Sequence, residues 1–114
     1  MFYFQGVLDS AINYYELSRP IFEQLNEQKF LSYNLNNLAQ IYKKVGNNQK
    51  AIEAYLSSLK IKKAQQDSLG LNNAYLNLSS AYLAIGDYQN SHFYASDALD
   101  LAKARKAKNY IASA

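Results

Sequence analysis

Hydrophobic side chains recur along this chain at the three- and four-residue spacing of an amphipathic helix. Two such stripes are Leu31, Leu35, Leu38, Tyr42 and Val45, and, forty residues later, Leu71, Tyr75, Leu78, Tyr82 and Ile85. The two stripes agree position by position. The pattern predicts two equivalent first helices, one over residues 31–45 and the other over residues 71–85.

A glycine repeats with the same forty-residue period, at Gly6, Gly46 and Gly86. Gly46 precedes Asn47, and Gly86 precedes Asp87. Glycine readily adopts the left-handed conformation that ends a helix, and Asn or Asp caps the helix that follows. Each glycine therefore predicts a tight turn between two helices, and second helices are expected to begin near residues 7, 48 and 88.

Each second helix has a stripe of its own that is expected to face the first helix. Examples of this stripe are Ala51, Tyr55 and Leu59 in one unit and Ala95, Leu99 and Ala102 in the next. The position five residues after each glycine is small, namely Ala11, Ala51 and Ser91, which lets two helices approach closely. Because one hairpin cannot bury both of its faces, neighbouring hairpins are expected to stack into a solenoid.

The composition also favours an all-α fold. The chain has 114 residues, which suits one domain over residues 1–114, and only four Gly and one Pro are present to make turns. The absence of cysteine excludes disulfides and thiolate metal sites, and the cytoplasm is the expected compartment. Because no window approaches the roughly 18 apolar residues of a membrane span, and the N-terminus lacks signal-peptide features, no membrane partner is expected.

The basic residues are expected to serve structure. Twelve Lys and Arg against nine Asp and Glu give a net charge of +3, too small an excess to require a nucleic-acid partner. They form two clusters, Lys60, Lys62 and Lys63, and Lys103, Arg105, Lys106 and Lys108. Both clusters lie near predicted C-terminal ends of helices, where cations offset the helix macrodipole. Nucleic-acid binding is the alternative, and it would show as a steep salt dependence.

No group of residues predicts catalysis. The sequence contains no glycine-rich phosphate loop, nucleophile elbow or zinc-protease motif, and its carboxylates are scattered over predicted solvent faces. The only histidine, His92, takes the place of Ile12 and Ile52 in the other units, so it is expected to be a partly buried packing residue. No cluster of metal ligands accompanies it. We therefore expect no enzyme, no metal and no cofactor.

Eight positions recur in both complete units: Leu35, Leu38, Ala39, Tyr42, Gly46, Ala51, Tyr55 and Ser58, then Tyr75, Leu78, Ser79, Tyr82, Gly86, Ser91, Ala95 and Ala98. This order resembles the tetratricopeptide repeat, in a longer form than the common one of about 34 residues, and the resemblance covers the whole chain. Ser91 and Ala95 depart from the usual Ala and aromatic residue, and the closing proline is missing, so longer second helices are expected. The resemblance implies a right-handed superhelix of about two and a half hairpins.

In that family the first helices line the concave face, so the resemblance nominates a ligand-binding surface on them. Its residues are Tyr33, Asn36, Gln40, Lys43 and Lys44, followed by Asn73, Leu76, Ser80, Leu83 and Ala84. The amide and ammonium groups in the first set suit a peptide carboxylate or an acidic segment. Leu76 and Leu83 suit either an apolar ligand contact or packing under a following unit. The family's clamp for C-terminal carboxylates needs basic residues on three first helices and is not implied here.

The recurring tyrosines and asparagines have expected structural roles. Five tyrosines fall on packing positions and are expected in the core: Tyr15, Tyr42, Tyr55, Tyr75 and Tyr82. Four others fall off those positions and are candidates for exposed contacts: Tyr33, Tyr88, Tyr94 and Tyr110. Asn37 and Asn77 recur one period apart and are expected to bind backbone between units.

Both ends of the chain fall inside a repeat unit. Only residues 2–5 precede Gly6, and Ala114 aligns with Ala74 early in a first helix. The sequence therefore predicts an excerpt of a longer protein, or a homodimer in which the cut units complete each other. Residues 4–6 resemble the remainder of a cleavable tag, but Phe2 and Gly6 fall in the repeat register, which favours native sequence.

Pro20 lies in a predicted helical stretch, at the position of Lys60 and Asp100 in the other units. Proline removes a backbone donor and crowds the preceding turn. The sequence therefore predicts a kink or break near Ser18 and Arg19.

These features predict an interaction module that binds a protein or peptide segment by shape and polar contacts. Long repeats of this kind resemble those of bacterial signalling proteins, next to sensor kinases and response regulators. The alternative is therefore a peptide-sensing regulatory domain whose stack changes curvature when the peptide binds. An attached kinase, receiver or DNA-binding segment would distinguish the two.

Overall fold

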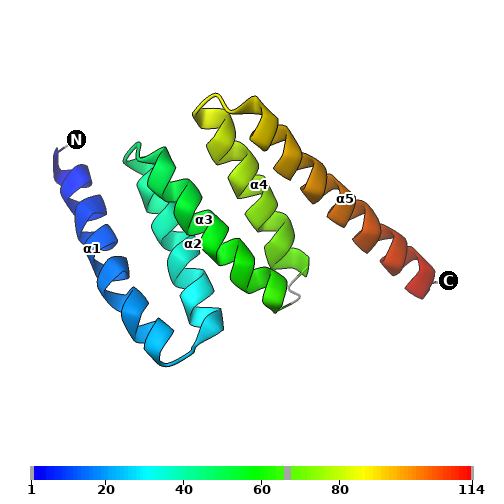
Figure 1. Cartoon of the computed structure of the whole chain (residues 1–114), viewed down its shortest axis with the longest axis horizontal. Coiled ribbons are helices and arrows are strands. Elements are labelled where there is room, and N and C mark those ends of the chain that lie inside the picture. The colour runs from blue at the N-terminus through cyan, green and yellow to red at the C-terminus, as the bar shows by residue number, and fades with distance from the viewer. Residues whose placement is uncertain (1, 66–67, 114) are drawn as a thin grey trace.

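The computed structural model describes residues 2–65 and 68–113, and this part of the chain forms five α-helices. They are α1 (Phe2–Gln24), α2 (Gln28–Lys44), α3 (Asn48–Ala64), α4 (Ser68–Ala84) and α5 (Tyr88–Ser113). Each helix packs mainly against the next one along the chain, so that the helices form a row with extents of 54 × 37 × 21 Å (Figure 1). The expected all-α stack of hairpins is confirmed.

The two glycine turns that join α2 to α3 and α4 to α5 are built as expected. Gly46 and Gly86 have φ angles of 86° and 79°, in the left-handed region that glycine tolerates best. Asn47 Oδ1 accepts the backbone N–H of residue 50 at 3.2 Å, and Asp87 Oδ1 accepts that of residue 90 at 3.2 Å. These bonds satisfy amide donors at the start of each second helix.

The N-terminal part differs from the expected pattern. α1 runs from Phe2 to Gln24 without interruption, so Gly6 lies inside a helix, and the helix does not break near Ser18 and Arg19 as expected. Gly6 is followed by Val7, which cannot cap a new helix as Asn47 and Asp87 do. Beyond Pro20, α1 still packs on α2, because the ring of Phe22 stacks on that of Phe30 with centroids 5.9 Å apart. The turn comes instead at Asn26, whose φ of 55° is tolerated by asparagine.

The longer second helix expected from the missing proline is found in α5 but not in α3, which has 17 residues like α2 and α4. α5 contains 26 residues, and it passes through the place where another first helix was expected to begin. Residues 101–108 are Leu, Ala, Lys and Arg, which are all strong helix formers, so nothing local ends the helix there. The basic cluster at Lys103, Arg105 and Lys106 therefore lies within α5, and its expected place at a helix end is wrong.

The core is formed by α2, α3 and α4. Its fully or nearly fully buried members are Leu38, Ala39, Tyr42, Ala51, Ile52, Ala54, Tyr55, Leu59, Ala74, Leu78 and Ala81. The five tyrosines expected in the core are all there, because Tyr15, Tyr75 and Tyr82 pack against this cluster, partly buried, beside the buried Tyr42 and Tyr55. The tyrosine rings thus fill the space that the small residues leave between helices.

Small residues meet where the helices of each hairpin approach. In the first hairpin Ala39 and Ala51 are both fully buried. In the second hairpin the equivalent residues are serines, and Ser79 Oγ lies 3.1 Å from Ser91 Oγ and donates to the Ser91 carbonyl at 2.8 Å. The second hairpin therefore keeps the close approach and adds polar contacts across it.

The outer face of α5 is open. Leu99 is 55% exposed and Ala102 is also exposed, so the expectation that both face the partner helix is wrong. His92 is exposed too, whereas its counterpart Ile52 is buried. The reason is that α3 packs on both α2 and α4, whereas α5 packs mainly on α4.

Candidate functional site

A groove of about 370 Å³ runs between the first helices of the two units, α2 and α4. It is lined by Gln40, Lys43, Lys44, Tyr55 and Asn77. The two helices are joined there by polar side chains. Lys43 Nζ donates to Ser80 Oγ at 2.6 Å, and Asn77 Nδ2 donates to Asn36 Oδ1 at 3.5 Å.

The groove brings together most of the polar residues nominated on α2. Gln40 and Lys44 are exposed and make no hydrogen bond to the other described residues. Lys43 and Asn36 are partly buried in their contacts with α4. No acidic side chain lines the groove, so a carboxylate entering it would meet an ammonium group and amide donors.

Tyr33 lies away from this groove. It is 54% exposed and lines a small cavity of about 170 Å³ at the junction of α1 and α2. Phe22 and Phe30 lie in the same cavity with their rings stacked 5.9 Å apart, and so does Tyr14, which is 67% exposed. The sequence did not identify this aromatic junction, because Tyr14 belongs to no repeated stripe.

Leu76 and Leu83 point to a different part of the surface from the groove. They are 50% and 56% exposed, and they occupy the positions of Asn36 and Lys43 one period later. Since Asn36 and Lys43 contact the following first helix, Leu76 and Leu83 lie on the edge of α4 where such a helix would pack. Asn73 and Ala84, the remaining nominated residues of α4, are exposed.

Two expectations about side-chain roles are wrong. Tyr94 is partly buried, because its ring packs against Tyr75 and Tyr82, whereas Tyr33 and Tyr88 are exposed as expected; the side chain of Tyr110 lies outside the described residues. The asparagine that binds backbone between units is Asn34, whose Nδ2 donates to the Tyr15 carbonyl at 3.2 Å.

Asn37 instead is exposed, and Asn77 bonds to a side chain. The reason is their place on the helix: Asn37 lines the cavity at the junction of α1 and α2, and Asn77 lines the groove, whereas Asn34 is buried against α1.

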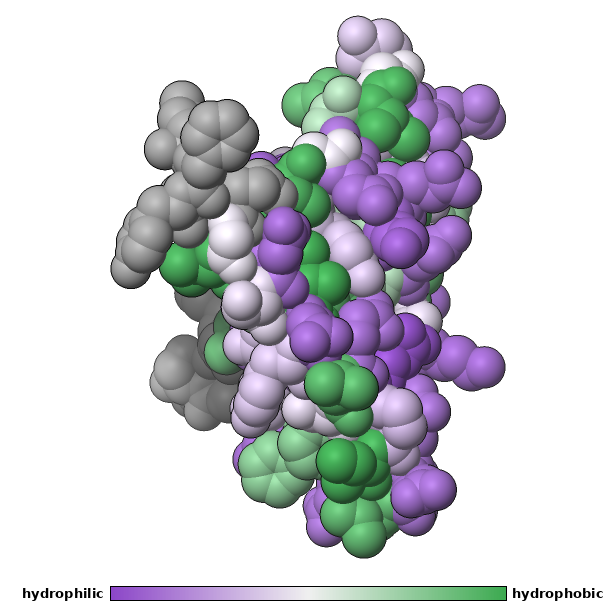
Figure 2. Space-filling view, turned by 90° about the vertical axis from the view of Figure 1, so that its left-hand side faces the viewer, coloured by the Kyte–Doolittle hydropathy of each residue, from purple (hydrophilic) through white to green (hydrophobic). Residues whose placement is uncertain are grey.

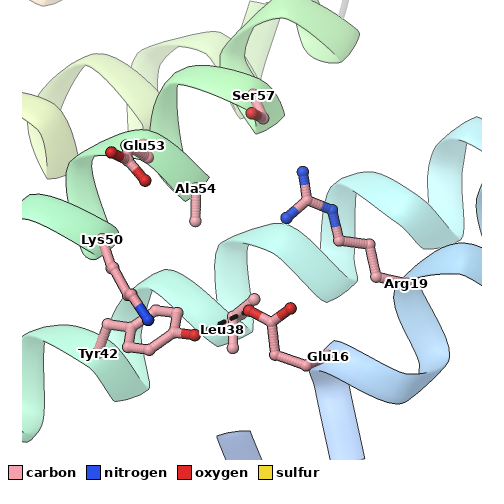
Figure 3. Close-up of a pocket in the computed structure, with 8 residues that line it drawn as sticks. All are labelled: Glu16, Arg19, Leu38, Tyr42, Lys50, Glu53, Ala54 and Ser57. Atoms are coloured by element: carbon pink, nitrogen blue, oxygen red, sulfur yellow. Dashed lines mark hydrogen bonds between the residues drawn. The ribbon is translucent and has the colours of Figure 1, made fainter.

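A second cavity, of about 300 Å³, lies between α1 and α3 over α2 (Figure 3). Four charged residues line it: Glu16 and Arg19 from α1, and Lys50 and Glu53 from α3. Tyr42 Oη donates to Glu16 Oε1 at 2.8 Å. Burial, reinforced by this hydrogen bond, raises the pKa of Tyr42 to about 12. The sequence analysis missed this cavity, and only a comparison of Ala54 with Tyr94, one period later, could have revealed it.

The end of the molecule formed by α1 has a mixed surface. Val7, Leu17 and Ile21 are each more than half exposed along this helix, and so is Leu25 in the turn that follows it. Figure 2 shows separate green apolar areas there among purple polar side chains. The apolar residues on this face are thus interrupted by polar ones.

The described side chains offer binding groups rather than metal ligands. Among residues 2–65 and 68–113, no group of three or more His, Cys, Asp or Glu side chains is placed to hold a metal ion. Within the same ranges, no helix combines the length and the apolar character of a membrane span.

Comparisons with known proteins agree with the repeat pattern. The model of the tetratricopeptide repeat family matches the sequence over residues 1–64 and again over residues 30–104. One solved structure that matches is the crystal structure of BtubC (BKLC) from P. vanneervenii, with 18% identity and a TM-score of 0.44. The match covers 89% of this chain but only 59% of that chain. A search of curated proteins found no match.

Proposed function

The chain belongs to the tetratricopeptide repeat family, and we propose that it is a scaffold that binds an acidic segment of another protein in the groove between α2 and α4. Repeats of this family generally serve as protein-interaction scaffolds. The observation that supports this proposal is the lining of the groove, where exposed Gln40 and Lys44 stand beside Lys43 without an acidic neighbour.

The anchored side chains would orient such a segment. Lys43 is held by Ser80, and Asn36 by Asn77, so neither needs to be ordered when the partner binds. Gln40 and Lys44 are free to donate to backbone carbonyls or carboxylates of the bound segment. The groove therefore combines a rigid base with adaptable polar contacts.

A regulatory role in a bacterial signalling protein would add a change of stacking on binding. No contact between the described helices favours this role over the simpler scaffold. The cytoplasm remains the expected compartment for either role, and we further propose that two copies associate through their end units.

Selection of peptides from a displayed random library would test the proposed function. We expect the selected peptides to be rich in Asp and Glu, and Lys44→Ala to weaken binding about tenfold, because a charge-assisted hydrogen bond contributes about 1.5–3 kcal/mol and part of it is lost to water. The affinities would be measured by fluorescence anisotropy. Lys60→Ala is the matched control, because Lys60 is exposed on α3 and does not line the groove.

Two results would contradict the proposal. One is a selected set without acidic residues. The other is equal loss of affinity in Lys44→Ala and Lys60→Ala, which would indicate a general effect of net charge. The side chains of Lys44 and Lys60 are both exposed to water, so neither substitution is expected to change the fold.

A further inference from the structure

The charged cavity between α1 and α3 has a counterpart in the next unit that is filled. Ala54, which lines the cavity, aligns with Tyr94. The ring of Tyr94 stacks on Tyr82 with centroids 5.7 Å apart and an interplanar angle of 4°, and it lies 6.2 Å from the ring of Tyr75. An aromatic side chain therefore occupies, in the second unit, the space that alanine leaves open in the first.

The walls of the cavity are also different in the two units. Arg19 and Glu53 align with Leu59 and Phe93, which are apolar. Glu16 likewise aligns with the apolar Leu56, whereas Lys50 aligns with Asn90 and Ser57 with Asp97. The first unit thus combines an open space with four charged side chains, and the second combines a filled space with walls in which three of those four are replaced by apolar residues. Since a cavity lined only by packing residues would be apolar, this coincidence indicates a place for a polar ligand.

The two walls of the cavity are α1 and α3, and each supplies one acidic and one basic side chain. Figure 3 shows Arg19 and Glu53 on opposite sides of Ala54, whereas Lys50 and Glu16 lie to either side of Tyr42. Among the described residues, no ion pair joins the two walls. Arg19 instead bonds along its own helix to Glu23 at 3.1 Å, an exposed pair of the kind that contributes little to stability.

Lys50 and Glu53 are likewise available to a ligand. Lys50 Nζ lies 5.5 Å from the centroid of the Tyr42 ring. Lys50 and Glu53 are both exposed on α3. The charges of the four residues at pH 7 cancel. The matching ligand therefore has no net charge but carries both a cation and an anion.

We propose that this cavity binds a zwitterionic aromatic amino acid, free or as the residue of a dipeptide. Its carboxylate would bind Arg19, its ammonium group would bind Glu53, and its ring would lie over Leu38 and Ala54 in the space that Tyr94 fills in the next unit. A volume of about 300 Å³ is enough for such a ligand and is at the lower end of known small-molecule sites. The site is distinct from the α2–α4 groove, with which it shares no lining residue.

L-Phenylalanine is a suitable probe, followed by NMR chemical shifts of the ¹⁵N- and methyl-labelled protein. A ligand of this size, at ordinary efficiency per atom, gives a dissociation constant on the order of 1 mM. We expect saturable shifts centred on the Ala54 methyl group. N-Acetylphenylalanine and phenylalaninamide, which each lack one charge, should bind at least about tenfold more weakly, since each loses a charge-assisted hydrogen bond. If a phenylalanine dipeptide binds more tightly than free phenylalanine, the ligand of the cavity is a peptide rather than the free amino acid.

Variants locate the site. Ala54→Tyr copies the second unit and should abolish the shifts by filling the cavity. If Ala54→Tyr does not fold, Arg19→Gln and Glu53→Gln carry the test, because both side chains are at least partly exposed and each should raise the dissociation constant about tenfold. Lys60→Gln, outside the cavity, should leave binding unchanged.

The proposal is overturned if no saturable shift occurs up to roughly ten times the expected dissociation constant, or if Arg19→Gln and Lys60→Gln bind alike. Acidic peptides that still bind the groove under these conditions would show that the proposed scaffold function stands without this second site.

Discussion

The two hairpins of this molecule share a repeat but not an environment. The first, α2 and α3, is packed between α1 and α4, whereas the second, α4 and α5, is covered mainly on one side. Leu59 in the first hairpin is 6% exposed, and Leu99, its counterpart in the second, is 55% exposed. In a repeat protein, the burial of a residue thus depends on the neighbouring unit as much as on the pattern of its own unit.

The largest expected contrast is between truncations of these two leucines. Leu59→Ala removes buried apolar surface and leaves a cavity, so it should lower the free energy of unfolding by about 2–4 kcal/mol. Leu99→Ala should lower it by less than about 1 kcal/mol, because its side chain is already largely in water. Urea denaturation followed by circular dichroism measures both.

Equal losses in the two variants would mean that Leu99 is covered in solution. Repeating the measurement at several protein concentrations would then show whether a second copy provides the cover, since stability that comes from association rises with concentration.

A smaller contrast concerns two equivalent tyrosines. Tyr42 donates a hydrogen bond to Glu16, and its pKa is raised to about 12 by burial and by that bond; burial also raises the pKa of Tyr82. Tyr42→Phe should cost about 1 kcal/mol at neutral pH, with a smaller loss for Tyr82→Phe, because the Tyr42 hydroxyl bonds to a carboxylate.

The high pKa of Tyr42 also sets a pH dependence. The unfolded tyrosine loses its proton near pH 10, whereas the folded one keeps it until about pH 12, so stability contributed by the neutral hydroxyl is present below pH 10 and lost as the pH rises towards 12. Denaturation at a series of pH values should therefore show a shallower alkaline decline in Tyr42→Phe. A decline equal to that of the wild type would show that Tyr42 does not control it.

The smallest expected effects have opposite signs at equivalent glycines. Gly46 has a positive φ, so Gly46→Ala should destabilise the protein by about 1 kcal/mol. Gly6 lies inside α1 with nothing within 4 Å of an added Cβ, so Gly6→Ala should stabilise it by about 0.5–1 kcal/mol. Thermal unfolding of the two variants would test the contrast. A loss of stability in Gly6→Ala would indicate that Gly6 forms a turn after all.

Much of the fold could be predicted because several signals agree in both complete units. The stripes, the glycine and the capping Asn47 or Asp87 all define the same hairpin. The predictions failed where only one signal remained. Gly6 has the register of a turn but no capping residue after it, and Pro20 opposes a helix that packs along α2.

The candidate site was less predictable, because it depends on differences between units rather than on their agreement. The polar residues of α2 could be nominated from the surface of a repeat. The charged cavity between α1 and α3 follows from no recurring position, and its one sequence signal is a difference, the small Ala54 in the place of the large Tyr94. A sequence pattern shows which residues recur. To predict an open space, one must also know which neighbouring side chains are too small to fill it.

The serine pair between α4 and α5 has a consequence for how the two units could have diverged. If Ala39 and Ala51 of the first hairpin were both changed to serine, the order of the two substitutions would affect stability. A serine placed first at position 39 could donate to the carbonyl of residue 51, as Ser79 does to Ser91. A serine placed first at position 51 would face only the methyl group of Ala39 across the interface. If position 39 changes first, the new hydroxyl has a hydrogen-bond acceptor at once. If position 51 changes first, the new hydroxyl is buried without a partner on the opposite helix.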